Sequence, residues 1–192
     1  MNEEDLIRSK ILNGATQLFQ RFGLKKTTMD EIAKSVGMGK SSLYYYFKSK
    51  EDVFNSVVTE ELQKLRSSVD KAVKQKSELS DKLIIYANTY FTELVPRETL
   101  YRIVNKEDNE AGTMSRLKMI IDFEIDYLTN LLIEHSTEGQ KQSFSNVSEV
   151  RAFAETIVCS IYGLIHYSFV INSNADNKKF NEMVSMIMKR LL

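Results

Sequence analysis

Residues 28–50 read Thr-Met-Asp-Glu-Ile-Ala-Lys-Ser-Val-Gly-Met-Gly-Lys-Ser-Ser-Leu-Tyr-Tyr-Tyr-Phe-Lys-Ser-Lys, and their spacing predicts two short helices joined by a tight turn. Thr28 and Glu31 have the spacing of a capping box, in which two side chains satisfy free backbone N–H groups at a helix start. Gly37 ends this helix, because glycine adopts the left-handed C-cap conformation without steric cost. The apolar stripe of the helix consists of Ile32, Ala33 and Val36.

The second helix, predicted over residues 40–47, would bury Leu43 and Phe47, which lie four residues apart. Two short helices joined by a glycine-containing turn are the geometry that sets the second helix into a DNA major groove. Lysine, serine and tyrosine side chains there can meet base edges, phosphates and thymine methyl groups. The stretch therefore predicts a DNA-reading helix-turn-helix, whose outward-facing residues are Lys40, Ser41, Ser42, Tyr45 and Tyr46.

Two ordinary surface helices are the alternative interpretation of this stretch. Three adjacent tyrosines that mostly face solvent argue against it, because exposed aromatic clusters usually mark interaction surfaces. The charge distribution also favours DNA. Residues 1–50 hold nine Lys or Arg against five Asp or Glu, whereas the rest of the chain holds 17 against 21. A basic N-terminal part is suited to bind a polyanion.

The whole chain has the pattern of an all-α protein. Its 192 residues include one proline and seven glycines, and hydrophobic periods of 3.6 residues dominate. We find no internal repeat and no long alternating β pattern. The pattern predicts about nine helices, over residues 3–22, 28–36, 40–47, 49–76, 80–95, 98–106, 114–135, 147–170 and 177–192.

Several classes of protein are disfavoured by composition. The chain has no apolar run of membrane-spanning length, and its first residues are acidic, unlike a signal peptide, so we expect a cytoplasmic protein. One cysteine, Cys159, excludes an intrachain disulfide, and only two histidines are present, so we expect no metal site and no cofactor. We also expect no enzyme, because we find neither a glycine-rich phosphate loop nor a nucleophile elbow.

The N-terminal part resembles the DNA-binding domain of the TetR family of transcriptional regulators. The resemblance covers about the first 50 residues by motif, and the remainder only by length and helical character. The matching residues are Leu18-Phe19-Gln20-Arg21-Phe22-Gly23, Thr27-Thr28, Ile32-Ala33, Gly37, Lys40, Leu43-Tyr44-Tyr45-Tyr46-Phe47 and Lys50. The resemblance implies a DNA-binding domain over residues 1–49 and a helical effector-binding and dimerisation domain over residues 50–192.

The resemblance also implies roles for single residues. Phosphate contacts fall on Thr28, Tyr46 and Lys50, base-edge contacts on Lys40, Ser41 and Ser42, and contacts to thymine methyls or backbone on Tyr44 and Tyr45. One position departs from the family pattern. Gly39 stands where serine often caps the recognition helix, so this cap lacks a side chain.

The last two predicted helices have broader apolar faces than one monomer core needs. In a TetR-like protein they pair with their copies in a four-helix dimer interface, and the small residues Ala152, Ser160 and Gly163 would allow close approach. A bundle closed within one chain is the alternative. It fits a two-fold DNA reader poorly, because such a reader needs a dimer.

Aromatic side chains on the predicted inner helices could surround a small organic effector, which we expect to be hydrophobic or aromatic. The ligand-binding candidates are Tyr86, Tyr90, Phe123, Tyr127, Tyr162 and His166. A packed core is the alternative for each of these residues, and His166 could be a core histidine with satisfied hydrogen bonds.

These observations predict a transcriptional repressor that binds a palindromic operator as a homodimer and is released by an effector. An effector-independent architectural DNA-binding dimer is the alternative, and a filled core with sequence-insensitive binding would favour it. A third hypothesis, an enzyme or a protein-partner module, requires that loss of Lys40 or Tyr45 leave DNA affinity unchanged.

Overall fold

The computed structural model describes residues 2–97, 111–138, 144–171 and 176–191. The described residues form eight α-helices and no strand, so the all-α prediction is confirmed. The ninth predicted helix, over residues 98–106, lies outside the described residues, as do residues 108–110 of a predicted turn. Parts of two further predicted connections, residues 139–143 and 172–175, also lie outside them.

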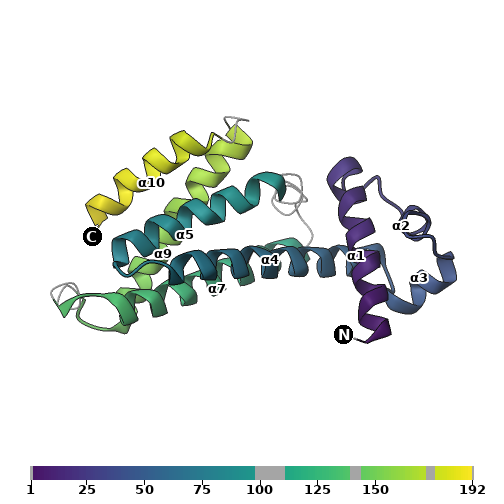
Figure 1. Cartoon of the computed structure of the whole chain (residues 1–192), viewed down its shortest axis with the longest axis horizontal. Coiled ribbons are helices and arrows are strands. Elements are labelled where there is room, and N and C mark those ends of the chain that lie inside the picture. Colours follow the sequence, from purple (N-terminus) through teal and green to yellow (C-terminus); the bar gives the residue numbers. More distant parts are fainter. Residues whose placement is uncertain (1, 98–110, 139–143, 172–175, 192) are drawn as a thin grey trace. The chain divides into compact units, whose positions relative to one another are not determined.

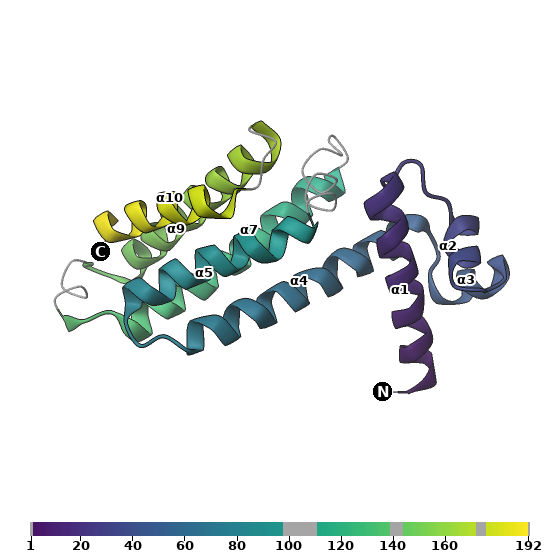
Figure 2. The ribbon, with the colours of Figure 1, turned by 45° about the horizontal axis from the view of Figure 1, so that its top comes forward.

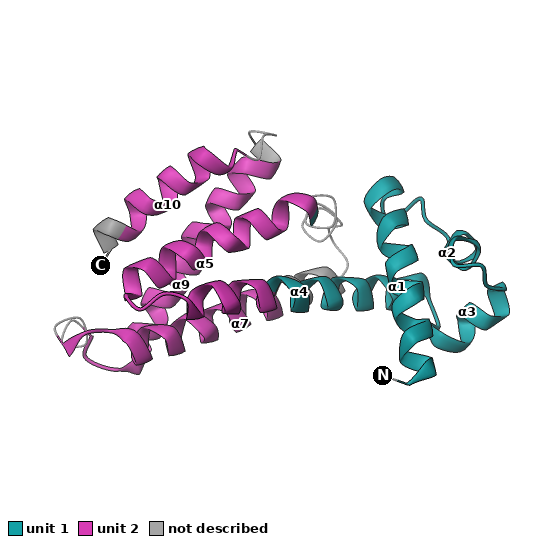
Figure 3. Cartoon of the chain, viewed as in Figure 1, with its two compact units in different colours: residues 1–65, 97–103 teal, residues 66–96, 104–192 magenta. Residues whose placement is uncertain are grey.

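The chain divides into two compact units. One contains residues 1–65 and 97–103, and the other contains residues 66–96 and 104–192 (Figure 3). The division falls inside helix α4 (Lys50–Lys74), which runs without interruption from one unit into the other. The boundary predicted between residues 49 and 50 coincides instead with the start of this helix.

The first unit begins with three helices, α1 (Glu3–Phe22), α2 (Met29–Ser35) and α3 (Lys40–Tyr46) (Figure 1). Asn2 caps α1 in a capping box with Asp5 that the sequence analysis did not identify. Gly23 ends α1 with a φ of 79°, a conformation that favours glycine.

The α1–α2 contact is close because position 14 lacks a side chain. A Cβ atom on Gly14 would lie 2.6 Å from Val36 Cγ1 and 2.8 Å from Ser35 Oγ. Glycine inside a helix costs about 1 kcal/mol relative to alanine. The contact with the end of α2 therefore accounts for a glycine at this position.

The core of the first unit is apolar and draws on all of its helices. Phe19 and Phe54 meet edge to face, with ring centroids 5.3 Å apart. The other fully buried members include Ile11, Ala15, Ile32, Leu43 and Val53. Phe22 shares the helical stripe of Ile11 and Ala15, a position that favours burial, but its side chain is 46% exposed. The hydrophobic periodicity predicts which face of a helix is buried, but it does not predict where along the helix the packing partners end. At Phe22, the last residue of α1, the ring lies against the Arg21 guanidinium.

The second unit consists of the end of α4, α5 (Leu79–Leu94), α7 (Ala111–His135), α9 (Val147–His166) and α10 (Asn177–Leu191). Figure 2 shows these long helices layered on one another. Helix α7 packs along α9, and α5 packs along α10. In the α5–α10 contact, Phe91 stacks on Phe180 with centroids 3.8 Å apart.

The predicted helix limits are correct to within a few residues. The Asp52 N–H donates to the Ser49 hydroxyl at 3.0 Å and so caps the start of α4. Pro96 lies in a short 3₁₀ turn, Val95–Arg97, directly after α5. The predicted helix over residues 147–170 changes at its end into a π-helical turn, Tyr167–Ile171. Across the described parts of the chain, none of the helices combines the length and apolarity that crossing a bilayer requires.

We predict that Gly14→Ala destabilises the protein by about 1–3 kcal/mol, because the added methyl group overpacks the α1–α2 contact. Chemical denaturation monitored by circular dichroism measures this free energy of unfolding. The matched control is Asn13→Ala, which makes the same kind of helix-favouring change at an exposed position of the same helix and should not destabilise. Equal stability of the two variants would contradict the steric account.

Candidate DNA-binding surface and ligand cluster

Local hydrogen bonds and the backbone conformation of Gly37 fix the start of α2 and the turn between α2 and α3. Thr28 Oγ1 accepts from the Glu31 N–H at 3.3 Å, and Glu31 Oε2 accepts from the Thr28 N–H at 2.8 Å, so the predicted capping box is confirmed. Gly37 has a φ of 70°, and the Met38 N–H donates to the Ala33 carbonyl at 2.9 Å. Gly39 begins α3 without a side-chain cap, as expected.

One side of helix α3 is buried within the first unit, and the other side is exposed to solvent. Leu43 is fully buried and Phe47 is 3% exposed, whereas Lys40, Ser41 and Ser42 are exposed. The tyrosines differ from one another: Tyr45 is 78% exposed, Tyr44 is 44% exposed and Tyr46 is half-buried. The rings of Tyr45 and Tyr46 meet edge to face. The structure therefore brings five predicted contact residues onto one exposed surface, namely Lys40, Ser41, Ser42, Tyr44 and Tyr45.

Two other predicted DNA-contacting residues already have hydrogen bonds within the unit. The hydroxyl group of Thr28 belongs to the capping box, although the residue is exposed. The ammonium group of Lys50 is half-buried and donates to the Leu24 carbonyl at 2.8 Å. Lys50 therefore fixes the loop after α1, and any phosphate contact would compete with this bond.

Arg8 supports the end of α3 from α1, a role that the sequence analysis missed. Its guanidinium donates to the Tyr46 carbonyl at 3.0 Å and lies 4.4 Å from the centroid of the Phe47 ring. Arginine is suited to both contacts, since it donates in a planar fork and stacks on aromatic faces. Tyr46 and Phe47 are 38 and 39 residues from Arg8 in sequence. No local pattern relates positions so far apart.

In the second unit, the structure brings four of the predicted ligand-binding residues together. Tyr86 stacks on Tyr127 with centroids 5.8 Å apart and lies 5.9 Å from Tyr90, whose ring is 6.0 Å from that of Tyr162. The hydroxyl groups of Tyr90 and Tyr162 share a hydrogen bond of 2.8 Å. Burial raises the pKa of Tyr86 and of Tyr90 well above the usual value, and that of Tyr127 to about 12. The phenols are therefore neutral at physiological pH.

A buried carboxylate, Glu124, joins this tyrosine cluster. It is 3% exposed, and its Oε2 accepts a hydrogen bond of 2.7 Å from the Tyr86 hydroxyl. Arg66 Nε lies 3.5 Å from its Oε1. Burial raises the pKa of Glu124, while the Tyr86 bond and the Arg66 charge act in the opposite direction. In the sequence, Glu124 and Asp126 flank the apolar side of this helix, a position typical of a solvated face, so the local pattern does not indicate that Glu124 is buried.

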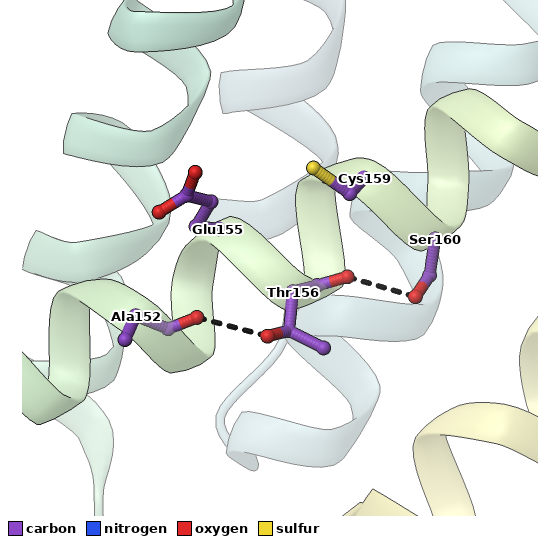
Figure 4. A pocket seen from close by; sticks show the side chains of 5 residues that line it. All are labelled: Ala152, Glu155, Thr156, Cys159 and Ser160. Carbon is purple, nitrogen blue, oxygen red and sulfur yellow. Dashed lines mark hydrogen bonds between the residues drawn. The ribbon is translucent and has the colours of Figure 1, made fainter.

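The other two ligand candidates lie outside the cluster. Phe123 is 44% exposed and has the Arg66 guanidinium over its ring, and His166 is exposed at the end of α9. A shallow, open hollow of about 460 Å³ lies instead on the outer face of α9 (Figure 4). Its lining residues are Ala152, Glu155, Thr156, Cys159 and Ser160. Within the described residues, no group of three His, Cys, Asp or Glu side chains is placed to hold a metal ion.

Comparison with known proteins adds sequence relatives. Residues 11–57 match the model of the family described as bacterial regulatory proteins, tetR family. The chain is 32% identical over 112 residues to YhgD, an uncharacterized HTH-type transcriptional regulator of Bacillus subtilis, and this match spans 57% of each chain. It is 44% identical over 52 residues to IcaR of Staphylococcus aureus, the HTH-type negative transcriptional regulator of a biofilm operon, across 27% of this chain and 28% of IcaR.

The fold is also shared with solved structures. The crystal structure of the transcriptional regulator FadR from Bacillus subtilis in complex with stearoyl-CoA superposes with a TM-score of 0.75. The superposition covers 94% of this chain and 96% of FadR, at 19% sequence identity. This likeness extends the similarity from the N-terminal helices to the arrangement of the whole helical chain.

We predict that Glu124→Gln stabilises the protein relative to wild type increasingly as pH rises. The folded pKa of Glu124 is raised, so its favourable contribution is complete below the unfolded value near 4.5 and is lost as pH rises through the folded value. Glutamine can still accept the Tyr86 hydrogen bond but has no charge to bury. Urea denaturation of both proteins across pH 4–8 gives the difference in unfolding free energy, and a pH-independent difference would contradict the prediction.

Proposed function

The chain belongs to the TetR family of transcriptional regulators, and we propose that it is a repressor that binds a palindromic operator as a homodimer and is released by a small-molecule effector. Its relatives are transcriptional regulators and not enzymes. Because its partner is chromosomal DNA, we expect it to act in the cytoplasm. Repression in particular is supported by the similarity to IcaR, a negative transcriptional regulator.

The exposed surface of α3 is the observation that carries the DNA-binding proposal. Helix α3 buries only Leu43 among its seven residues, and the side chains of Lys40, Ser41, Ser42, Tyr44 and Tyr45 are exposed to a partner. In the proposed complex, Lys40, Ser41 and Ser42 meet base edges near the N-terminus of α3, and Tyr44 and Tyr45 meet thymine methyls or backbone. Tyr46, Thr28 and Lys50 contact phosphates, with Lys50 exchanging its bond to Leu24 for the phosphate.

The outer face of α9 supports the homodimer. It carries small exposed residues, Ala152, Thr156, Cys159 and Gly163, and it is hollowed where the first three lie. Small residues let a second helix approach closely, and the outer face of α10 exposes Met186. Pairing α9 and α10 with their copies would set two recognition helices into successive major grooves, about 34–36 Å apart.

The second unit would hold the effector. We propose residues 1–49 as the DNA-binding domain and residues 50–192 as the effector-binding and dimerisation domain. The effector is a hydrophobic or aromatic molecule, and the candidate contacts remain Tyr86, Tyr90, Phe123, Tyr127, Tyr162 and His166. The stearoyl-CoA bound to FadR, a protein of the same fold, carries a long hydrophobic acyl chain. Release requires an effector that prefers the DNA-incompetent state by about 1–3 kcal/mol.

An architectural DNA-binding dimer without an effector is the second candidate function. The close ring contacts and hydrogen bonds of the tyrosine cluster favour it, because they are those of a packed core. Fluorescence-anisotropy titration against DNA from the region upstream of its own gene and against a scrambled duplex distinguishes the two. Preference for the upstream DNA supports the repressor, and equal affinity for both supports the architectural protein.

We predict that Tyr45→Ala weakens binding to the preferred DNA by about 1–3 kcal/mol and weakens binding to scrambled DNA much less. Its side chain is 78% exposed, so the free energy of unfolding should change by no more than about 0.5 kcal/mol. The control Gln63→Ala, at an exposed position of α4, should bind both duplexes like wild type. Equal losses on the two duplexes would exclude a base-reading role for Tyr45.

We predict that Thr156→Arg shifts the protein from dimer to monomer, because it introduces two mutually repelling charges into a close helix contact. Sedimentation velocity at micromolar concentration measures the change, and affinity for the palindromic site should fall with it. Asn130→Arg makes a comparable charge change on the exposed face of α7 and should remain dimeric. A dimeric Thr156→Arg variant would place the interface elsewhere.

A further inference from the structure

Glu124 is a buried carboxyl group whose ionised form has an incomplete counter-charge. A carboxylate enclosed in a protein is stable only if opposite charge and hydrogen bonds replace its lost hydration. Glu124 has one short hydrogen bond, from Tyr86 at 2.7 Å. Its cationic neighbour, Arg66, lies 3.5 Å away, which is within ion-pair range but beyond the usual 2.7–3.2 Å of an N–H···O bond. The enclosed Arg66 Nε makes no hydrogen bond with any described group.

Arg66 is the member of this pair that can leave. Its side chain is 34% exposed, whereas that of Glu124 is 4% exposed. The guanidinium packs over Phe123, which is itself 44% exposed, so Arg66 can move towards solvent without opening the core. A ligand that entered here would therefore meet a fixed negative charge and a displaceable positive one.

The surroundings of Glu124 are aromatic. Tyr86 and Tyr127 stack beside it, and Tyr90 and Tyr162 continue the row of rings. Ring faces carry negative electrostatic potential and attract ammonium groups, so aromatic side chains combined with a carboxylate are suited to bind quaternary amines. An uncharged ligand that displaced Arg66 would leave Glu124 without a counter-charge, and an anionic group would be repelled by it.

We propose that the tyrosine cluster binds an organic cation, an ammonium ion with hydrophobic substituents, which takes the place of Arg66 against Glu124. This inference rests on the proposed function for its biological meaning and names the chemical class of the effector. Arg66 belongs to α4, the helix that begins directly after the helix-turn-helix and is continuous through position 66. Displacement of Arg66 would therefore change the side-chain contacts of the helix that connects the two units.

Equilibrium dialysis with two probes of nearly identical shape tests the proposal. Benzyltrimethylammonium carries the charge, and neopentylbenzene is its uncharged carbon isostere. We expect wild-type protein to bind the cation about tenfold or more tightly than the isostere. Equal affinities, tighter binding of the isostere, or no binding of the cation would overturn the proposal.

Two variants should change the cation affinity in opposite directions. Glu124→Gln keeps the shape of the site and should lower the affinity for the cation about tenfold or more, while leaving that for the isostere unchanged. Arg66→Met removes the competing charge and should raise the affinity for the cation. Arg97→Met is the matched control, since it removes an arginine that pairs with Glu61 in the other unit, and it should have no effect. Weaker cation binding by Arg66→Met, or unchanged binding by Glu124→Gln, would overturn the proposal.

Anisotropy measurements with labelled upstream DNA separate this inference from the proposed function. If the protein prefers the upstream DNA and the cation releases the protein from that DNA, both the repressor proposal and the cationic effector are supported. If stearoyl-CoA releases the DNA and the cation does not, the repressor stands and the cationic effector is excluded. If the protein shows no preference for the upstream DNA but the probes still differ as expected, the repressor proposal fails and the cation site stands.

Discussion

The contact between α1 and α2 at Gly14 is the constraint on which the DNA-binding surface depends. Helices of seven residues are too short to be stable alone, so tertiary packing must hold α2 and α3 in place. The missing Cβ at position 14 lets the Ser35–Val36 end of α2 lie against α1. The Gly37 turn then sets the direction of α3, and Leu43, Phe47 and Arg8 fix its end. The solvent-facing side chains of α3 gain their geometry from these buried contacts.

Much of this architecture could be predicted from local sequence rules. Capping boxes, glycine C-caps and hydrophobic period act over one or two helical turns, so the limits of α1, the Thr28–Glu31 cap and the Gly37 turn could be deduced. The family resemblance rested on the N-terminal residues for the same reason, because residues that begin and end helices are frequent there. The exposed position of Tyr45 followed from the helical phase of Leu43 and Phe47.

The features that could not be predicted depend on side chains that meet across long stretches of sequence. Arg8 pairs with the end of α3, and Glu124 with Tyr86, each over 38 residues, and nothing in local composition marks such partners. Phe22 shows the converse, because its periodic position is right for burial but the side chain lies at the last residue of α1. His166 is exposed because it continues the solvent-facing stripe of Cys159 and Gly163 along α9.

In the proposed cation site, Glu124 and Arg66 would allow a packed cluster to respond to a ligand. A core made only of apolar side chains has little to gain from exchanging its contacts for those of a ligand. A buried carboxylate with one hydrogen bond and a loosely placed arginine is different, because its burial remains only partly compensated. A ligand group that supplies the missing positive charge would therefore bind with a favourable free energy that the ligand-free protein lacks. Since Arg66 lies on the helix that continues into the first unit, that gain would be available, under the proposed function, to shift the population of DNA-competent states.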